Sequence, residues 1–339
     1  MFKKVIIQGR LEFGKELTYT KVFDMFEHMI DVRFKNAILV TEEHFDPETY
    51  LLDFDRTVIQ ASVKYYKNTI DLLNYMVQFA VSGTISAWLI DEGKVLNSHV
   101  FEPGSEKIVV QAYLKGKKLS EEKGKEEDAI KSLDKALKKY DRHSQAYERR
   151  AHVNYKLGNV EDAVYDYEKS IRLDARNAAA YMGLGHIKFK QKKYKDAAEN
   201  FEMATKTAVA LQPMYWVARR HKAIAHIKME EWSKAEFDLR LFTKRDFSND
   251  EMNSAHLQWA FSEYGMVLME VGKYDEAIDA FDEALKLSAE GTKKERAEKL
   301  LNRGIAKQKA GGSGFLSDWK EAAHLGDSKA KKLLEVHAN

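Results

Sequence analysis

The amino-acid sequence predicts a mainly α fold, in which a solenoid of helical hairpins follows a small α+β domain. Short blocks with a central alanine recur in the last two-thirds of the 339-residue chain, at intervals that suit a helix–turn–helix unit. The first hundred residues lack this repeat and combine strand-like alternation with helical patterns. We therefore expect two parts, an α+β domain at residues 1–105 and a repeat array at residues 106–339.

The N-terminal part is predicted to mix strands and helices. Alternating apolar residues predict a strand from Val5 to Phe13, and a second strand is expected at Asn36–Thr41. Apolar residues at helical spacing predict a helix over Tyr19–Phe34 and a long one over Arg56–Ala80. A hairpin is expected within Thr84–Phe101, because apolar runs flank the turn-forming sequence Asp-Glu-Gly-Lys.

Two aspartates precede the long predicted helix. The sequence from Asp53 to Thr57 resembles the Asp-x-Asp-x-Thr nucleophile motif of haloacid-dehalogenase-like phosphatases, which implies magnesium-dependent phosphoryl transfer on a doubly wound sheet. Arg56 stands where that family has a glycine, and no second acidic pair follows in the domain. We favour a helix start, in which Asp53 and Asp55 stabilise the first turn through the helix dipole.

Three histidines raise the question of a metal site. His28, His44 and His99 could join Asp46 or Glu48 around a metal ion. Their spacing matches no ligand pattern, so we interpret them as surface or packing histidines. No phosphate-cradling glycine loop or nucleophile elbow is present in the sequence. We expect no metal, no cofactor and no catalytic residues.

Five alanines in similar contexts define the repeat, namely Ala129, Ala163, Ala197, Ala235 and Ala277. The first two intervals are 34 residues, and the later ones are 38 and 42. Small residues allow two helices to approach closely, and aromatic residues fill the space between hairpins. We expect five to six repeats, followed by a C-terminal capping helix.

These blocks resemble tetratricopeptide repeats (TPR), a family whose unit is a 34-residue helical hairpin. The unit Ser144–Asn177 carries the residue classes of the family at fixed offsets, including Tyr147, Ala151, Gly158, Ala163 and Tyr167. The resemblance covers about residues 108–335. It is weakest before Tyr140, where Lys117 stands at the position expected for a small residue. The ending Asp-Trp-Lys-x-Ala-Ala-x-Leu-Gly-Asp resembles that of bacterial TPR proteins, so we expect a bacterial source.

The resemblance to TPR proteins implies a concave groove, lined by the first helix of each repeat, that binds a partner polypeptide. The lining residues predicted by offset are Glu148, His152, Tyr155, Lys156, Met182, His186, Phe189, Lys190, Arg220, Ile224, Ile227, Lys228 and Met266. This mixture of apolar and basic side chains suits an amphipathic ligand segment with acidic side chains or a terminal carboxylate. Docking on the convex face is the alternative, because charged helix faces are often merely solvated. His152 and His186 share one offset and are interpreted as ordinary groove histidines.

Composition and charge narrow the classes of function. The chain has no cysteine, which excludes disulfides, thiolate metal sites and cysteine nucleophiles. Its 55 Lys and Arg residues against 53 Asp and Glu give no global attraction to nucleic acid or an anionic membrane. Leu72–Ile90 lacks charged residues, but polar residues and Gly83 interrupt it, so we do not predict a membrane span. We expect a cytoplasmic protein.

The predicted function is that of a non-catalytic adaptor or scaffold, whose groove binds a partner protein. The N-terminal domain could dock a second partner or mediate self-association through a sheet edge. An RNA-associated role is the first alternative, supported by Tyr155, Phe189 and Arg220 in the predicted groove. An N-terminal enzyme with a TPR regulatory arm is the second, and it would require Asp53 as its nucleophile.

Overall fold

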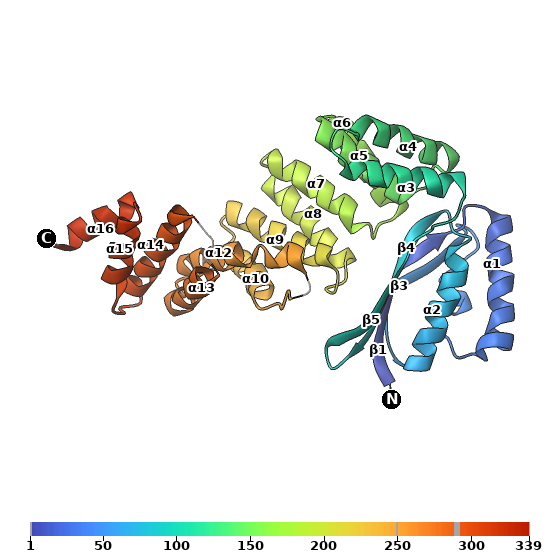
Figure 1. The fold of residues 1–339 in the computed structure, drawn as a ribbon, viewed down its shortest axis with the longest axis horizontal. Coiled ribbons are helices and arrows are strands. Elements are labelled where there is room, and N and C mark those ends of the chain that lie inside the picture. The colour runs from blue at the N-terminus through green and yellow to red at the C-terminus, as the bar shows by residue number, and fades with distance from the viewer. Residues whose placement is uncertain (1, 249, 288–291, 339) are drawn as a thin grey trace. The chain divides into compact units, whose positions relative to one another are not determined.

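The computed structural model describes residues 2–248, 250–287 and 292–338. The chain divides into two compact units, Met1–Ala180 and Tyr181–Asn339. The first unit contains a β-sheet, two helices that cover it, and the first helical hairpins, whereas the second unit is helical (Figure 1). The boundary predicted at residue 105 lies inside the first unit, between its last strand and its first hairpin.

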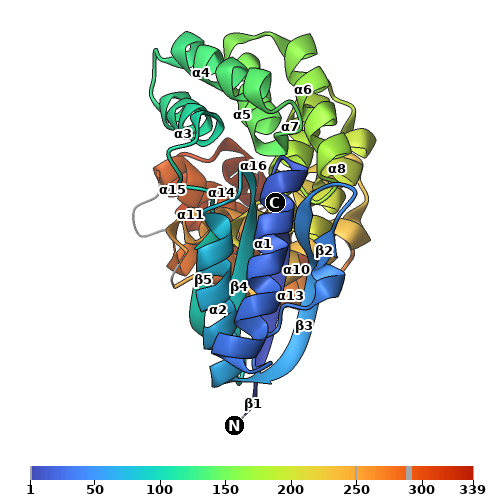
Figure 2. The same ribbon diagram turned by 90° about the vertical axis from the view of Figure 1, so that its right-hand side faces the viewer.

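The sheet of the first unit is antiparallel throughout, with the strand order β2-β3-β1-β4-β5. Its strands are β1 (Phe2–Glu12), β2 (Phe45–Asp46), β3 (Leu51–Ser62), β4 (Ser82–Asp91) and β5 (Lys94–Phe101). Helices α1 (Glu16–Met29) and α2 (Val63–Val77) lie next to each other on one face of the sheet (Figures 1 and 2). The strand predicted at Val5–Phe13 and the hairpin predicted within Thr84–Phe101 are therefore confirmed.

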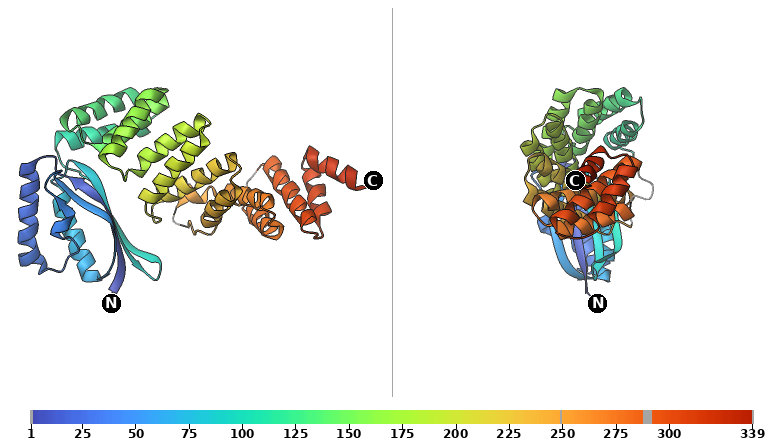
Figure 3. Two further views of the ribbon diagram at one scale, coloured as in Figure 1. Left: turned by 180° about the vertical axis from the view of Figure 1, so that it is seen from behind. Right: turned by 90° about the vertical axis from the view of Figure 1, so that its left-hand side faces the viewer.

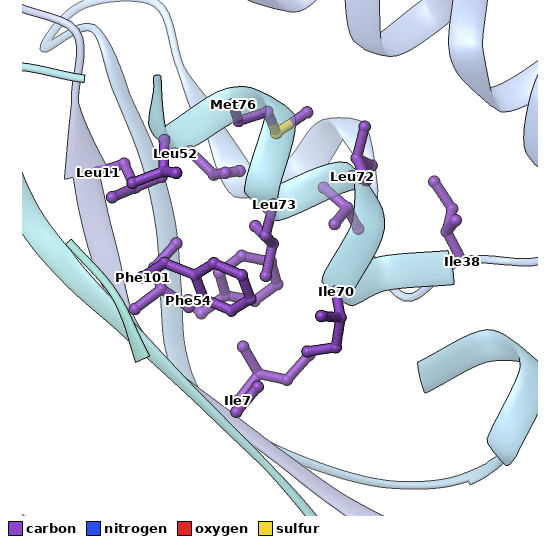
Figure 4. Packing of buried hydrophobic residues seen from close by; sticks show 14 of the residues in the cluster. Ile7, Leu11, Ile38, Leu52, Phe54, Ile70, Leu72, Leu73, Met76 and Phe101 are labelled. Carbon is purple, nitrogen blue, oxygen red and sulfur yellow. The ribbon is translucent and has the colours of Figure 1, made fainter. Parts of the chain in front are cut away.

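The core beneath this sheet lies between the strands and the two helices α1 and α2. Figure 4 shows Ile7 and Phe54 of the strands facing Ile70 and Leu73 of the helix, all buried in one cluster. Gly9 permits the close approach of β1 and β4, because its φ is 121° and a Cβ atom would lie 2.0 Å from the carbonyl oxygen of Thr84. A side chain cannot be accommodated there.

The strand predicted at Asn36–Thr41 is wrong. These residues follow a π-helical turn, η1 (Ile30–Phe34), and form an irregular segment ahead of the short helix η2 (Glu42–His44). Most of their apolar side chains are buried, but their backbone bonds to side chains of α2: Thr69 Oγ1 accepts from Leu39 N at 2.8 Å, and Asn68 donates to the Ala37 carbonyl at 2.8 Å. Burial produced the strand-like pattern without strand pairing.

The long helix predicted at Arg56–Ala80 is correct only from Val63 onward. Residues 51–62 form β3, which pairs with β1 from Phe2–Ser62 to Glu12–Leu51. Ser62 then caps α2, its hydroxyl accepting from the backbone N–H of Tyr65 at 3.3 Å. Asp53 and Asp55 thus lie in a strand, so the helix-dipole explanation of these acids is wrong.

The remaining helices pair in sequence, and the predicted solenoid of hairpins is confirmed. The first unit contains α3 (Ile108–Glu121), α4 (Glu126–Lys139), α5 (Ser144–Leu157) and α6 (Val160–Leu173). Then follow α7 (Ala178–Lys190), α8 (Tyr194–Thr207), α9 (Pro213–Lys228), α10 (Trp232–Thr243), the short α11 (Glu251–Ser254), α12 (Leu257–Glu270), α13 (Tyr274–Lys286), α14 (Lys293–Lys309), α15 (Phe315–His324) and α16 (Ser328–Ala338). Figure 3 shows these pairs from behind, from yellow α9 and α10 to red α14 and α15. Among the described residues, no helix is long and apolar enough to cross a bilayer.

In several hairpins, a glycine on the first helix packs against a large residue on the second. A Cβ atom at Gly185 would lie 2.4 Å from the Phe201 ring, and one at Gly265 would lie 2.7 Å from the Phe281 ring. In the first hairpin this small residue is Gly116, which meets Leu133, and not Lys117 as the sequence offset predicted. The predicted position is wrong by one residue, because the small and the large residue are one residue further apart in this hairpin than in the hairpins of Gly185 and Gly265.

Candidate binding groove

In the first unit, α5 carries the predicted groove residues. Glu148 is only 8% exposed, and burial raises its pKa although Arg149 and Lys117 lie nearby. Lys156 donates to the Ser120 carbonyl at 2.9 Å, which occupies one of its ammonium protons within the fold. His152 and Tyr155 are half-buried. This part of the predicted surface is thus largely committed to internal contacts.

In the second unit, the predicted residues lie on α7, α9 and α12, the first helices of three successive hairpins; we call this surface the first-helix face. Met182 was predicted to contact the ligand, but its side chain is only 5% exposed and is therefore not accessible. Phe189 packs edge-on against Tyr194, with ring centroids 5.2 Å apart. The more exposed predicted residues of this face are Lys190, Lys228 and Met266, whereas Ile224 and Ile227 are half-buried.

Histidine, arginine and tryptophan side chains meet on the first-helix face. His186 and His221 meet edge to face with ring centroids 4.5 Å apart. The Arg220 guanidinium lies over the Trp259 ring at 6.0 Å. Sequence offsets predicted that His186 and Arg220 line the groove. They missed His221, which follows Arg220 directly, and Trp259, which is not among the predicted lining residues. We call these four residues, with His256, the His/Arg cluster.

The His/Arg cluster contains a positive charge that no nearby carboxylate in the described part of the chain balances. Burial lowers the pKa of Arg220, and no carboxylate among the described residues forms an ion pair with it. Burial, followed by the nearby Arg220 and Lys190 charges, lowers the pKa of His186. Burial together with His186, Arg220 and His256 lowers the pKa of His221 to about 3. The histidines are therefore neutral at pH 7, and Arg220 supplies a half-buried positive charge without a counter-ion.

Several polar atoms of this face are buried and have no hydrogen-bond partner within the described structure. They include His186 Nε2 and Arg220 Nε, and, on α12, Gln258 Nε2 and Ser262 Oγ. A buried polar atom without a partner costs free energy, which an incoming acceptor recovers. The arrangement is therefore suited to bind an anionic or strongly polar oxygen.

The adjoining end of the first-helix face is acidic. A depression of about 180 Å³ between α12 and α14 is lined by Trp259, Met266, Glu263 and Glu298, among others. Burial, and then Glu298, raises the pKa of Glu263, while Lys228 opposes the shift. The predicted mixture of apolar and basic lining residues did not include these two glutamates, which make this end of the face acidic.

The histidines of the N-terminal domain do not come together. His44 packs on the Phe54 ring at 4.2 Å, whereas His99 lies beside Phe101 at 6.1 Å. Among the residues that the structure describes, no cluster of three His, Asp or Glu side chains is arranged to hold a metal ion.

Asp53, the candidate nucleophile, is bound by Arg176 in the loop after α6. Arg176 donates to the Asp53 carboxylate and, at 2.8 Å, to the Phe54 carbonyl. The sheet is antiparallel, whereas the phosphatase motif belongs on a doubly wound parallel sheet. The Asp-x-Asp sequence is therefore explained here by a contact between the sheet and the loop after α6.

Two segments of the chain match family models for this repeat: residues 151–192 match a model described as TPR repeat, and residues 259–290 one described as tetratricopeptide repeat. Among solved structures, the chain is similar to YrrB, described as a TPR protein with an unusual peptide-binding site. That likeness has a TM-score of 0.52 and 20% identity, and covers 61% of this chain and 98% of YrrB. Similarity to PilF of Pseudomonas aeruginosa has a TM-score of 0.50 and 18% identity, covering 68% and 99% of the two chains. No curated protein sequence matches this chain.

Proposed function

Because this chain is a tetratricopeptide-repeat protein, we propose that it is a non-catalytic adaptor whose first-helix face, on Tyr181–Asn339, holds an extended segment of a partner protein. The observation that carries the proposal is Arg220, a half-buried cation without a carboxylate partner in the described structure. YrrB, a structure with the same repeat fold, is described as having a peptide-binding site. Peptide binding is thus a function that this fold supports.

The polarity of the face defines the ligand that we propose. An acidic side chain or a terminal carboxylate would pair with Arg220 and accept a hydrogen bond from neutral His186. A basic residue further along the ligand would lie near Glu263 and Glu298, on the α12 and α14 side. Met266, which is 39% exposed, lines the same depression as the two glutamates and offers apolar contact there. The ligand is therefore an extended peptide with an acidic and a basic end.

A cytoplasmic location is part of the proposal, because a chain without cysteine is suited to a reducing compartment. We also propose a bacterial source, because the C-terminal sequence resembles the ending of bacterial TPR proteins.

The test is a selection of peptides from a random library displayed on phage, with the full chain as bait. Selected peptides are then measured by fluorescence anisotropy against the wild type, Arg220→Gln and the control Arg240→Gln, whose side chain is exposed on α10. Loss of a charge-assisted bond predicts affinity weaker by about tenfold or more for Arg220→Gln, and no change for the control. Added salt should weaken the wild type more than Arg220→Gln.

Two results would reject this assignment: the absence of any enriched class of acidic peptides, or acidic peptides that bind Arg220→Gln as well as the wild type. A labelled single-stranded RNA in the same assay tests the RNA alternative. Salt-sensitive RNA binding in the absence of any peptide binding would move the function to that class.

A further inference from the structure

A second surface with the properties of a binding site lies on the first unit, at strand β5. This strand is the last in the sheet order, and its only strand partner among the described residues is β4. The register shift between Leu89 and Ile90 leaves Leu96 unpaired, and the strand is regular from Asn97 to Phe101. Along this regular part, one side of the backbone has unpaired N–H and C=O groups.

The edge is not protected in the ways that exposed strands usually are. Natural edge strands carry charged residues or proline, or are covered by another element. β5 contains a single lysine, Lys94, at its start. Val95, Leu96 and Val100 are 44%, 53% and 63% exposed, so three of the large apolar side chains of this strand face water.

A groove of about 380 Å³ lies beside this edge, between β5 and α2. Its floor is apolar and consists of Tyr66, Ile70 and Leu89, which are 2%, 6% and 5% exposed. Its rim is polar: Lys67, Asp71 and Asn74 come from α2, and Asn97 and His99 come from β5. Tyr66 donates to the Asn97 side chain at 3.1 Å, which ties the rim to the floor.

We propose that β5 and this groove together bind an extended segment of a second partner protein, which adds to the sheet as a sixth strand. Main-chain hydrogen bonds to Asn97–Phe101 would give affinity, and alternate apolar side chains of the segment would enter the groove over Tyr66 and Ile70. This site is separate from the first-helix face and does not depend on the function proposed above.

The chemistry of the groove favours a foreign segment over a second copy of this chain. If two copies paired through β5, the side chains presented to each groove would be Asn97 and His99 of the other copy, because these lie on the α2 side of the strand. Two polar side chains do not match an apolar floor. A segment with valine, isoleucine or phenylalanine at alternate positions does.

The experiment starts from a random peptide library displayed on phage, selected on the full chain. Each enriched peptide is synthesised in two forms, unmodified and N-methylated at alternate residues, which removes main-chain donors on one edge. Binding is measured to the wild type, to Asn74→Trp, which fills the groove from an exposed helix position, and to Lys64→Trp, which adds the same residue at an exposed position outside it. Hydrogen exchange of residues 94–101 is followed with and without peptide.

The expected result is a class of alternating apolar peptides whose binding survives Lys64→Trp and Arg220→Gln. N-methylation and Asn74→Trp should each weaken it by about tenfold or more, and the peptide should slow exchange within Asn97–Phe101. The proposal is overturned if no such class is enriched, if N-methylation and Asn74→Trp leave binding unchanged, or if those amides exchange at the same rate with peptide. It is also overturned if the free chain sediments as a dimer whose β5 amides are already protected.

Discussion

The guanidinium of Arg150 and the carboxylate of Asp166 form a two-pronged ion pair, with Nε–Oδ2 and Nη2–Oδ1 distances that are both 2.8 Å. Arg150 also reaches Asp134 of the preceding hairpin at 2.5 Å. The same arrangement recurs in the second unit, where a cation on the first helix joins an acid of its own hairpin to one of the hairpin before. The recurrences are Glu202–Lys222–Asp238 and Asp282–Arg303–Asp318. Neighbouring hairpins are thus joined by charge as well as by apolar packing.

Removing the cation of the first triad should destabilise the first unit. Asp166 is only 2% exposed, so Arg150→Met leaves a buried carboxylate without its partner and should lower the free energy of unfolding by about 3 kcal/mol. The double variant Arg150→Met with Asp166→Asn should recover much of this loss, because no unpaired charge is left. Urea denaturation measures both. Arg172→Met is the control, since its pair with Glu168 is exposed and worth at most about 1 kcal/mol.

Gly185→Ala should destabilise the second unit, although alanine is the better helix former by about 1 kcal/mol. The added methyl group would lie 2.4 Å from the Phe201 ring, which cannot move without disturbing the α7–α8 contact. We expect a net loss of roughly 1–3 kcal/mol, measured by thermal or urea unfolding. Gly104→Ala has no atom within 4 Å of its new methyl group and should be nearly neutral. A stabilising Gly185→Ala would contradict the close packing described here.

Tyr140→Phe should weaken the junction between the sheet and the first hairpins. Glu12, 3% exposed, accepts from the Tyr140 hydroxyl at 2.7 Å and from Ser82 at 2.8 Å. Loss of a hydrogen bond to a buried charged group predicts destabilisation of about 1.5–3 kcal/mol. Hydrogen exchange should show faster opening at β1 and β4. Tyr165→Phe, on an exposed side chain, should leave the exchange rates unchanged.

Acidification should destabilise the second unit through its histidines. The pKa of His221 is lowered to about 3, chiefly by burial, whereas an unfolded histidine titrates near 6.5. The unfolded chain therefore binds the proton first, and the stabilisation that is present above pH 6.5 is lost as the pH falls toward 3. Between pH 7 and pH 5, the free energy of unfolding should fall less in His221→Asn than in the wild type. The difference should be at most about 1.4 kcal/mol for each pH unit below 6.5. Urea denaturation at the two pH values measures the difference, and equal losses in both proteins would contradict the assigned shift.

The hairpin pattern could be predicted because its main contact is local in sequence. Gly185 meets Phe201, and Gly265 meets Phe281, within a single hairpin, so the two residue types recur at a nearly constant interval. The same reasoning located the sheet hairpin, whose turn residues Glu92 and Gly93 have φ of 46° and 80°. The mainly α fold was therefore predictable from the chain alone.

The binding surfaces were predictable only in part. Helix offsets placed His186 and Arg220 on one face, but the pairing of His186 with His221, and the glutamates that follow, depend on how successive hairpins stack. Glu148 and Met182 fit the offsets equally well and are nonetheless buried. An offset defines the direction of a side chain from its own helix, whereas neighbouring hairpins determine its exposure.

By itself, the sequence determined the repeat, its hairpins and the sheet hairpin, since each depends on contacts within a few turns or across one tight turn. Only the tertiary structure decided that residues 51–62 pair with β1 as a strand, and that Asn36–Thr41 bonds to α2 without joining the sheet. In both segments the residue types suit either outcome. The backbone adopts the conformation that satisfies its N–H and C=O groups, and the partner that does so lies far away in the chain.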